Sequence, residues 1–113
     1  MSLPKSHTPL NALAEKIHVN AQRHGWWDTP VSFGDVAALV HSEVSEAFEE
    51  YRNDNGMFYV KDGKPEGIAV ELIDAVIRIL DYLASEGVDI DTVMQMKHEY
   101  NKERPYRHGG KKL

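Results

Sequence analysis

The sequence contains no cysteine, which excludes a disulfide framework, a thiolate metal site and a cysteine nucleophile. Basic residues are also few: 13 Lys and Arg stand against 18 Asp and Glu, giving a formal net charge of −5. This balance argues against general binding to nucleic acid or to an anionic membrane surface. A P-loop is missing as well, which disfavours attack at the γ-phosphate of the Walker type.

Long apolar runs are absent too. No uncharged apolar run approaches the roughly 18 residues of a membrane span. The first ten residues, MSLPKSHTPL, lack the apolar core of a signal peptide. We therefore expect a cytoplasmic protein without a membrane partner. The 113 residues suit a single domain over the whole chain, with a flexible start at 1–7 and a basic tail at 105–113.

What is present is a set of helical patterns, which predicts an all-α fold. Apolar residues recur at helical spacing over 10–24, where Thr8 would cap the helix and Pro9 would take its first position. A second helix over 33–52 begins at Ser32-x-x-Asp35, which resembles a capping box. Pro65 and Glu66 would open a third helix that ends near residue 87. A fourth helix covers 90–103, with Asp89 or Asp91 as its cap. A short strand and turn at 57–64 suggest a hairpin before the third helix.

The third helix carries the most unusual pattern. Its residues 67–83, GIAVELIDAVIRILDYL, are apolar around most of the circumference, which is typical of a buried helix. Four charged residues fall within an arc of about 80° at roughly 100° per residue; they are Glu71, Asp74, Arg78 and Asp81. Buried carboxylates require a cation. Arg78 could pair with Asp74 at i,i+4, or the carboxylates could bind a metal.

The second helix supplies a matching acidic set. Glu43 and Glu46 lie along the border of its apolar face, and Glu49 points outward. Packed antiparallel, the two helices would bring Glu43, Glu46, Glu71 and Asp74 to one point. Four hard oxygen ligands without cysteine favour Mg²⁺, with Mn²⁺ as the other candidate, and bound Mg²⁺ commonly meets a substrate phosphate.

Further residues could contact a nucleoside polyphosphate. Trp26 and Trp27 stand together in a loop, where they either cap the core or stack on a nucleobase. The polyphosphate could meet polar and basic side chains of the fourth helix and the tail, namely Lys97, Asn101, Arg104 and Lys111.

These residues resemble a known family. Glu43-Val44-Ser45-Glu46, followed after an insert by Glu71-Leu72-Ile73-Asp74, is similar to the ExxE…ExxD signature of the MazG-like all-α nucleotide pyrophosphohydrolases. Lys97-x-x-x-Asn101 and the ending from Arg104-Pro105 to Lys111 also match. The resemblance covers about residues 10–111.

The resemblance implies a four-helix MazG-like bundle that forms a homodimer or homotetramer. It implies Mg²⁺-dependent hydrolysis of a nucleoside triphosphate, with a deoxynucleoside favoured, to the monophosphate and pyrophosphate. Glu43, Glu46, Glu71 and Asp74 would hold Mg²⁺, while Lys97 and Asn101 would contact the substrate. Water would attack the α-phosphorus, and Glu46, or Glu43 beside it, would orient this water or take its proton.

Two alternatives stay open at the level of sequence. The protein could be a non-catalytic helical adaptor whose acidic residues form interhelical salt bridges. It could also be a di-iron carboxylate bundle, which requires two Glu-x-x-His pairs. Glu15 with His18 is the one such pair in the sequence.

Overall fold

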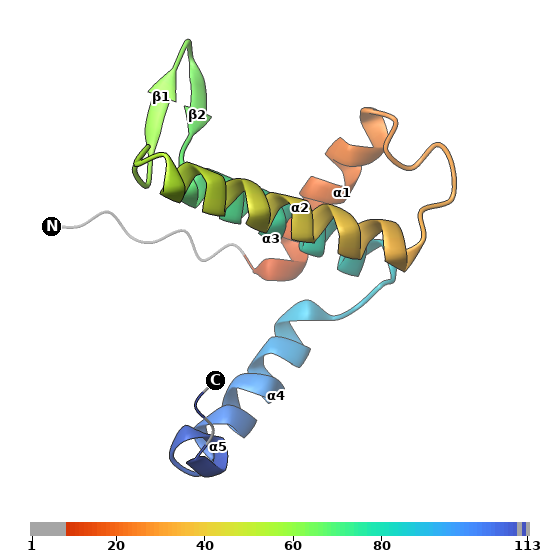
Figure 1. The fold of residues 1–113 in the computed structure, drawn as a ribbon. Helices are drawn as coiled ribbons and strands as arrows, with labels where there is room; N and C mark the ends of the chain where they lie inside the picture. Colours follow the sequence, from red (N-terminus) through yellow and green to blue (C-terminus); the bar gives the residue numbers. More distant parts are fainter. Residues whose placement is uncertain (1–8, 111, 113) are drawn as a thin grey trace, which may run out of the picture.

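The computed structural model describes residues 9–110 and 112 (Figure 1). The flexible start expected at 1–7 and the cap expected from Thr8 lie outside these residues. The described chain is mostly helical with one small sheet, in agreement with the expected class. Its elements are α1 (Leu10–Arg23), α2 (Phe33–Arg52), β1 (Tyr59–Lys61), β2 (Lys64–Glu66), α3 (Ile68–Ser85), α4 (Ile90–Lys102) and α5 (Arg107–Gly110).

The centre of the fold is the pair α2 and α3, which lie side by side and run antiparallel (Figure 1). The predicted capping box starts α2: Asp35 N donates to Ser32 Oγ at 3.1 Å, and Ser32 N donates to Asp35 Oδ2 at 3.3 Å. This box satisfies backbone donors that a helix start leaves free. It therefore fixes the residue at which α2 begins, and with it the turns of α2 on which the acidic residues lie.

Strands β1 and β2 form a two-stranded antiparallel sheet in the segment of the chain that connects α2 to α3. Asp62 and Gly63 both have positive φ, as a two-residue turn of type I′ requires. Pro65 and Glu66 lie in β2, so the expectation that they open the third helix is wrong. The helix starts later because Gly67 turns the chain with φ +117, and a Cβ at this glycine would lie 2.5 Å from Met57 O.

The start of α1 is capped from a distance. Pro9 is the N-cap and not the first helical residue, which corrects the prediction. The carboxylate of Asp91, in the first turn of α4, accepts from Leu10 N at 2.8 Å and from Asn11 N at 3.2 Å. Asn11 Oδ1 in turn accepts from Ile90 N at 2.7 Å. These bonds clamp the beginnings of α1 and α4 together, next to a small core of Ala14, Leu80 and Ile90.

Beyond this clamp, α4 projects away from α2 and α3 (Figure 1). The packed part of the described chain is α1 and α2 on either side of α3, so one chain does not form the expected four-helix bundle. The expected burial of α3 is also not met within one chain, since Ile73 is 53% exposed and Val76 is 50% exposed. None of the helices in residues 9–110 is long and apolar enough to cross a membrane.

Candidate metal centre and adjoining pocket

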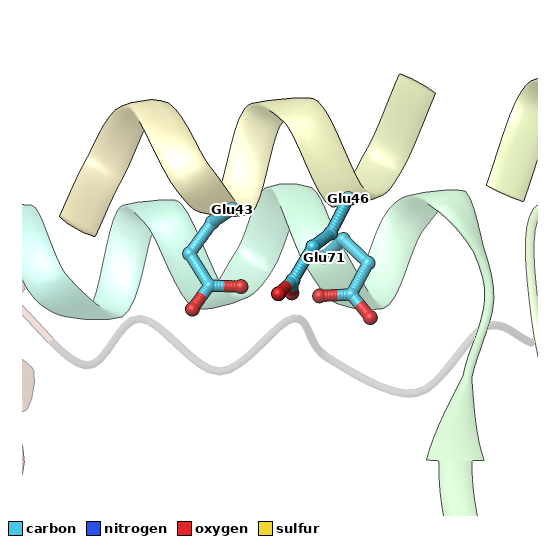
Figure 2. A group of neighbouring side chains, drawn as sticks. All are labelled: Glu43, Glu46 and Glu71. Carbon is cyan, nitrogen blue, oxygen red and sulfur yellow. The ribbon is translucent and has the colours of Figure 1, made fainter. Parts of the chain in front are cut away.

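Three of the four predicted metal-binding carboxylates lie together. Glu43 and Glu46 on α2 point toward Glu71 on α3 (Figure 2), and one carboxylate oxygen from each lies within 4.8 Å of the other two. Glu43 is buried at 7% exposure, Glu71 is half-buried, and Glu46 is exposed. The i,i+3 spacing on α2 and the antiparallel packing against α3 produce this convergence.

The cluster is electrostatically crowded. Burial, hydrogen bonding to Glu46 and Glu43, and the negative charges of Glu46 and Asp74 raise the pKa of Glu71 from 4.5 to about 7. Burial, followed by the negative charge of Glu43, also raises the pKa of Asp74 above its ordinary value. Near neutral pH, the Glu71 carboxyl group is therefore stabilised either by a proton or by a nearby cation. Oxygen-only donors suit Mg²⁺ or Mn²⁺, so the residues fit the implied ion.

Asp74, the fourth predicted ligand, is half-buried one turn further along α3. It is not among the oxygens that meet within 4.8 Å, and it lines the neighbouring pocket together with Glu43. A second acidic group continues from Glu71 in the other direction, toward the hairpin. It contains Glu50, Glu66 and Glu71, and Glu50 accepts from Tyr59 Oη at 3.3 Å. Glu71 is thus shared by both groups.

Arg78 is the cation that meets the buried Glu43. Its Nε and Nη2 both lie 3.0 Å from Glu43 Oε1, while the predicted pairing with Asp74 is not formed. The reason is that Arg78 reaches across to α2, where Glu43 is the more buried acid. Its guanidinium also lies 5.7 Å from the ring centroid of Trp26. In residues 9–110, no Lys, Arg or His lies within 4.0 Å of the carboxylates of Glu46 or Glu71.

A pocket of about 740 Å³ begins at the cluster. Glu43, Asp74 and Arg78 line one part of it, and both predicted tryptophans line another. Further walls come from α1 and from the start of α2. The two tryptophans differ in environment, since Trp26 is 60% exposed and Trp27 is half-buried. A mainly apolar pocket beside converging carboxylates can hold a flat ring, and a cation bound by the carboxylates can meet an anionic group of the same ligand.

A hydrogen-bonded group in the wall of the pocket was not anticipated from the sequence. Trp27 Nε1 donates to Asp81 Oδ1 at 3.0 Å and to Oδ2 at 3.1 Å. His18 Nδ1 lies 2.7 Å from Asp81 Oδ1. The charged Asp81 within an apolar helix was the visible signal, but helical spacing does not identify partners on α1 or in the loop. His18 is thus engaged with Asp81, and neither it nor Glu15 belongs to a possible metal-binding group in the described chain.

The residues predicted to contact the polyphosphate lie elsewhere. Lys97, Asn101 and Arg104 are on or directly after α4, and none of them lines the pocket of the described chain. Lys97 Nζ instead lies 4.8 Å from the ring centroid of Tyr100, and Arg104 Cζ lies 5.7 Å from it. Lys111 falls outside the described residues. The single chain therefore brings together the acidic residues and the tryptophans, but not the cations of α4.

Comparisons of the chain with protein-family models, with curated proteins and with solved structures find no match. The likeness to MazG-like enzymes thus rests on the motifs given above.

Proposed function

We propose that the protein is a Mg²⁺-dependent nucleoside triphosphate pyrophosphohydrolase of the MazG-like type. The observation that carries this proposal is the meeting of Glu43, Glu46 and Glu71 within 4.8 Å at the edge of a pocket lined by Trp26 and Trp27. Carboxylates that bind a divalent cation suit a phosphate chain, and the aromatic walls suit a base. The preferred products are a nucleoside monophosphate and pyrophosphate, with Mn²⁺ able to replace Mg²⁺.

Each residue has a distinct part in this proposal. Glu43, Glu46 and Glu71 hold Mg²⁺, with Asp74 beside them at the pocket. When bound, Mg²⁺ supplies positive charge to the phosphates and makes water more acidic. Glu46 is the exposed member of the cluster, so it is the group best placed to orient the attacking water and take its proton. Trp26 and Trp27 contact the base of the substrate. The α-phosphate of the substrate lies at the acidic cluster.

A homodimer or homotetramer belongs to the same proposal. Large apolar residues are exposed on the outer faces of α2 and α3, among them Val44, Ile73 and Val76 at 49%, 53% and 50%. Exposed large apolar residues favour an interface, and a two-fold dimer would cover them on both partners. The partner would complete the bundle, and its α4 would bring Lys97, Asn101 and Arg104 to the phosphates.

The second candidate function is a non-catalytic helical adaptor. The ion pair between Arg78 and Glu43 is the kind of interhelical contact that this alternative expects. It does not account for Glu46 and Glu71, which have no basic partner within 4.0 Å in the described residues. We therefore favour the hydrolase.

The deciding experiment measures pyrophosphate release from the common NTPs and dNTPs, with Mg²⁺ or with EDTA. The hydrolase requires Mg²⁺-dependent release that Glu71→Gln abolishes and that Glu49→Gln, a change on the exposed face of α2, leaves intact. In ¹⁸O-labelled water the label should enter the monophosphate. Label in inorganic phosphate, with a diphosphate as co-product, would mean attack at the γ-phosphorus. Absence of turnover across the panel would favour the adaptor.

A further inference from the structure

The loop between α1 and α2 forms a wall of the pocket, and the Trp27 side chain joins it to α3 by hydrogen bonds. The loop backbone turns at Gly25, where φ is +85, and Trp26 N donates to Ala21 O at 3.1 Å. These local bonds tie the loop to the end of α1. The indole of Trp27 provides the connection to α3, because Nε1 faces both oxygens of Asp81.

Asp81 holds two different rings at once. An indole N–H can only donate, and a carboxylate can only accept, so the Trp27 bond has one possible direction. His18 approaches the same carboxylate through Nδ1, and the His18 and Trp27 rings stand nearly perpendicular at 76° with centroids 5.1 Å apart. The side chains of His18 and Asp81 are 13% and 18% exposed. The plane of the Trp27 ring is therefore set by Asp81 on one edge and by His18 beside it.

The position of Asp81 on α3 relates this wall to the acidic cluster. Asp74, Arg78 and Asp81 follow one another at i, i+4 and i+7, and all three line the pocket. One helix face thus carries a candidate metal ligand, the arginine that meets Glu43 and the acceptor that holds Trp27. Because these residues lie on one continuous helix, the bond to Asp81 joins Trp27 to the same element that carries Glu71 and Asp74.

We propose that Asp81 is a positioning residue that holds the Trp27 ring as the wall against which the base of the substrate lies. This inference rests on the proposed function. Asp81 acts through Trp27, so its loss weakens substrate binding and leaves the chemistry at the cluster unchanged. The change expected is a higher KM at nearly constant kcat, because the wall contacts substrate equally in the ground and transition states.

The experiment compares four variants by KM, kcat and melting temperature, using the best nucleotide from the panel. Asp81→Ala should raise KM roughly tenfold, in line with the loss of a base–aromatic contact, and change kcat less than about twofold. Trp27→Phe keeps a ring but removes the N–H, and should give a similar rise. Asp81→Asn should stay near the wild-type KM, since its amide oxygen still accepts from Trp27 and its NH₂ can donate to His18 in the other tautomer. Glu86→Gln, an exposed change at the end of α3, is the matched control.

The double variant Asp81→Ala/Trp27→Phe separates positioning from independent effects. If Asp81 acts through the indole N–H, the KM of the double variant equals that of either single variant. If the fold-changes in KM of the two single variants multiply in the double variant, the two residues have independent roles. A wild-type KM in Trp27→Phe overturns the inference even if Asp81→Ala fails to fold, and so does lower melting of Asp81→Ala without a rise in KM. Inactive wild-type protein would overturn the proposed function and this inference together, while active protein with insensitive variants overturns the inference alone.

Discussion

Replacing Glu71 with Gln should make the metal-free protein more stable. Glu71 has its pKa raised from 4.5 to about 7 by burial and by Glu46 and Glu43, so the folded state holds its proton more tightly than the unfolded state does. The stability that this proton contributes is lost as pH rises from about 4.5 to about 7, and this contribution is absent above pH 7. Gln carries no charge at any of these pH values and can still hydrogen-bond to its neighbours.

The size of this effect follows from the pKa difference. A rise from 4.5 to about 7 corresponds to about 3 kcal/mol, at roughly 1.4 kcal/mol for each tenfold change in proton affinity. Because Glu71 is partly exposed and solvent screens its neighbours, we expect about 1–2 kcal/mol. For a domain of this size that is on the order of 5–10 °C in melting temperature. In EDTA at pH 8, Glu71→Gln should melt higher than wild type by this amount, and at pH 4.5 the difference should vanish.

Magnesium should invert this order. An ion that binds only the folded state adds RT ln(1 + [L]/Kd), roughly 2.7 kcal/mol at a hundredfold excess over Kd. Wild type should gain this stability with MgCl₂ and not with NaCl of equal ionic strength, while Glu71→Gln should gain little. Thermal melting by circular dichroism at one fixed protein concentration measures both effects, with Glu49→Gln as the control. A variant less stable than wild type in EDTA at pH 8, or equal Mg²⁺ shifts in both proteins, would refute the reasoning.

Four other perturbations test the remaining parts of the structure. Asp74→Asn should remove most pyrophosphate release while circular dichroism stays native, and near-normal turnover would remove it from the metal-binding set. Light scattering at micromolar concentration should give a dimer or larger, and Val76→Glu on the exposed face of α3 should lower the mass; a monomeric wild type contradicts the proposed interface. Lys97→Ala should raise KM, and mixing it with the inactive Glu71→Gln should give a fraction of sites with the wild-type KM if α4 acts on the partner; a mixture that keeps only the raised KM argues against this. Gly67→Ala should cost about 2 kcal/mol or more because φ is +117 and the new Cβ would meet Met57 O at 2.5 Å; an unchanged melting temperature contradicts the packing at this turn.

Local sequence patterns anticipated much of the helical arrangement. Ser32 and Asp35 determine where α2 begins through bonds within four residues, which a capping pattern contains in full. The spacing of Glu43 and Glu46 places both on one face, and antiparallel packing brings Glu71 to them. These features follow from helical geometry and from one assumption, that the two helices pack antiparallel. What the cluster binds stays a prediction, because neither spacing nor geometry identifies a ligand.

Contacts between distant segments were not accessible in the same way. Arg78 had an acidic neighbour at i−4 on its own helix, but it pairs with Glu43 across 35 positions. Asp91 was one of two candidates for the cap of α4, a role taken by Asp89, while Asp91 caps α1 instead. In each case more than one acidic group could take the same role, and the packing of distant segments decides among them. The face of α3 that its own chain leaves exposed was not predicted, because apolar periodicity does not distinguish a face covered by the same chain from one left open.

The clamp between the beginnings of α1 and α4 makes α4 a lever arm. Its pivot is the short set of bonds among Asn11, Ile90 and Asp91, and the next twelve residues extend about 18 Å beyond it at roughly 1.5 Å per residue. A tilt of about 10° at the pivot therefore displaces the Lys102 end by about 3 Å, as far as one hydrogen bond spans. A substitution at Asn11 or Asp91 that loosens this clamp would thus change where Lys97 and Asn101 lie.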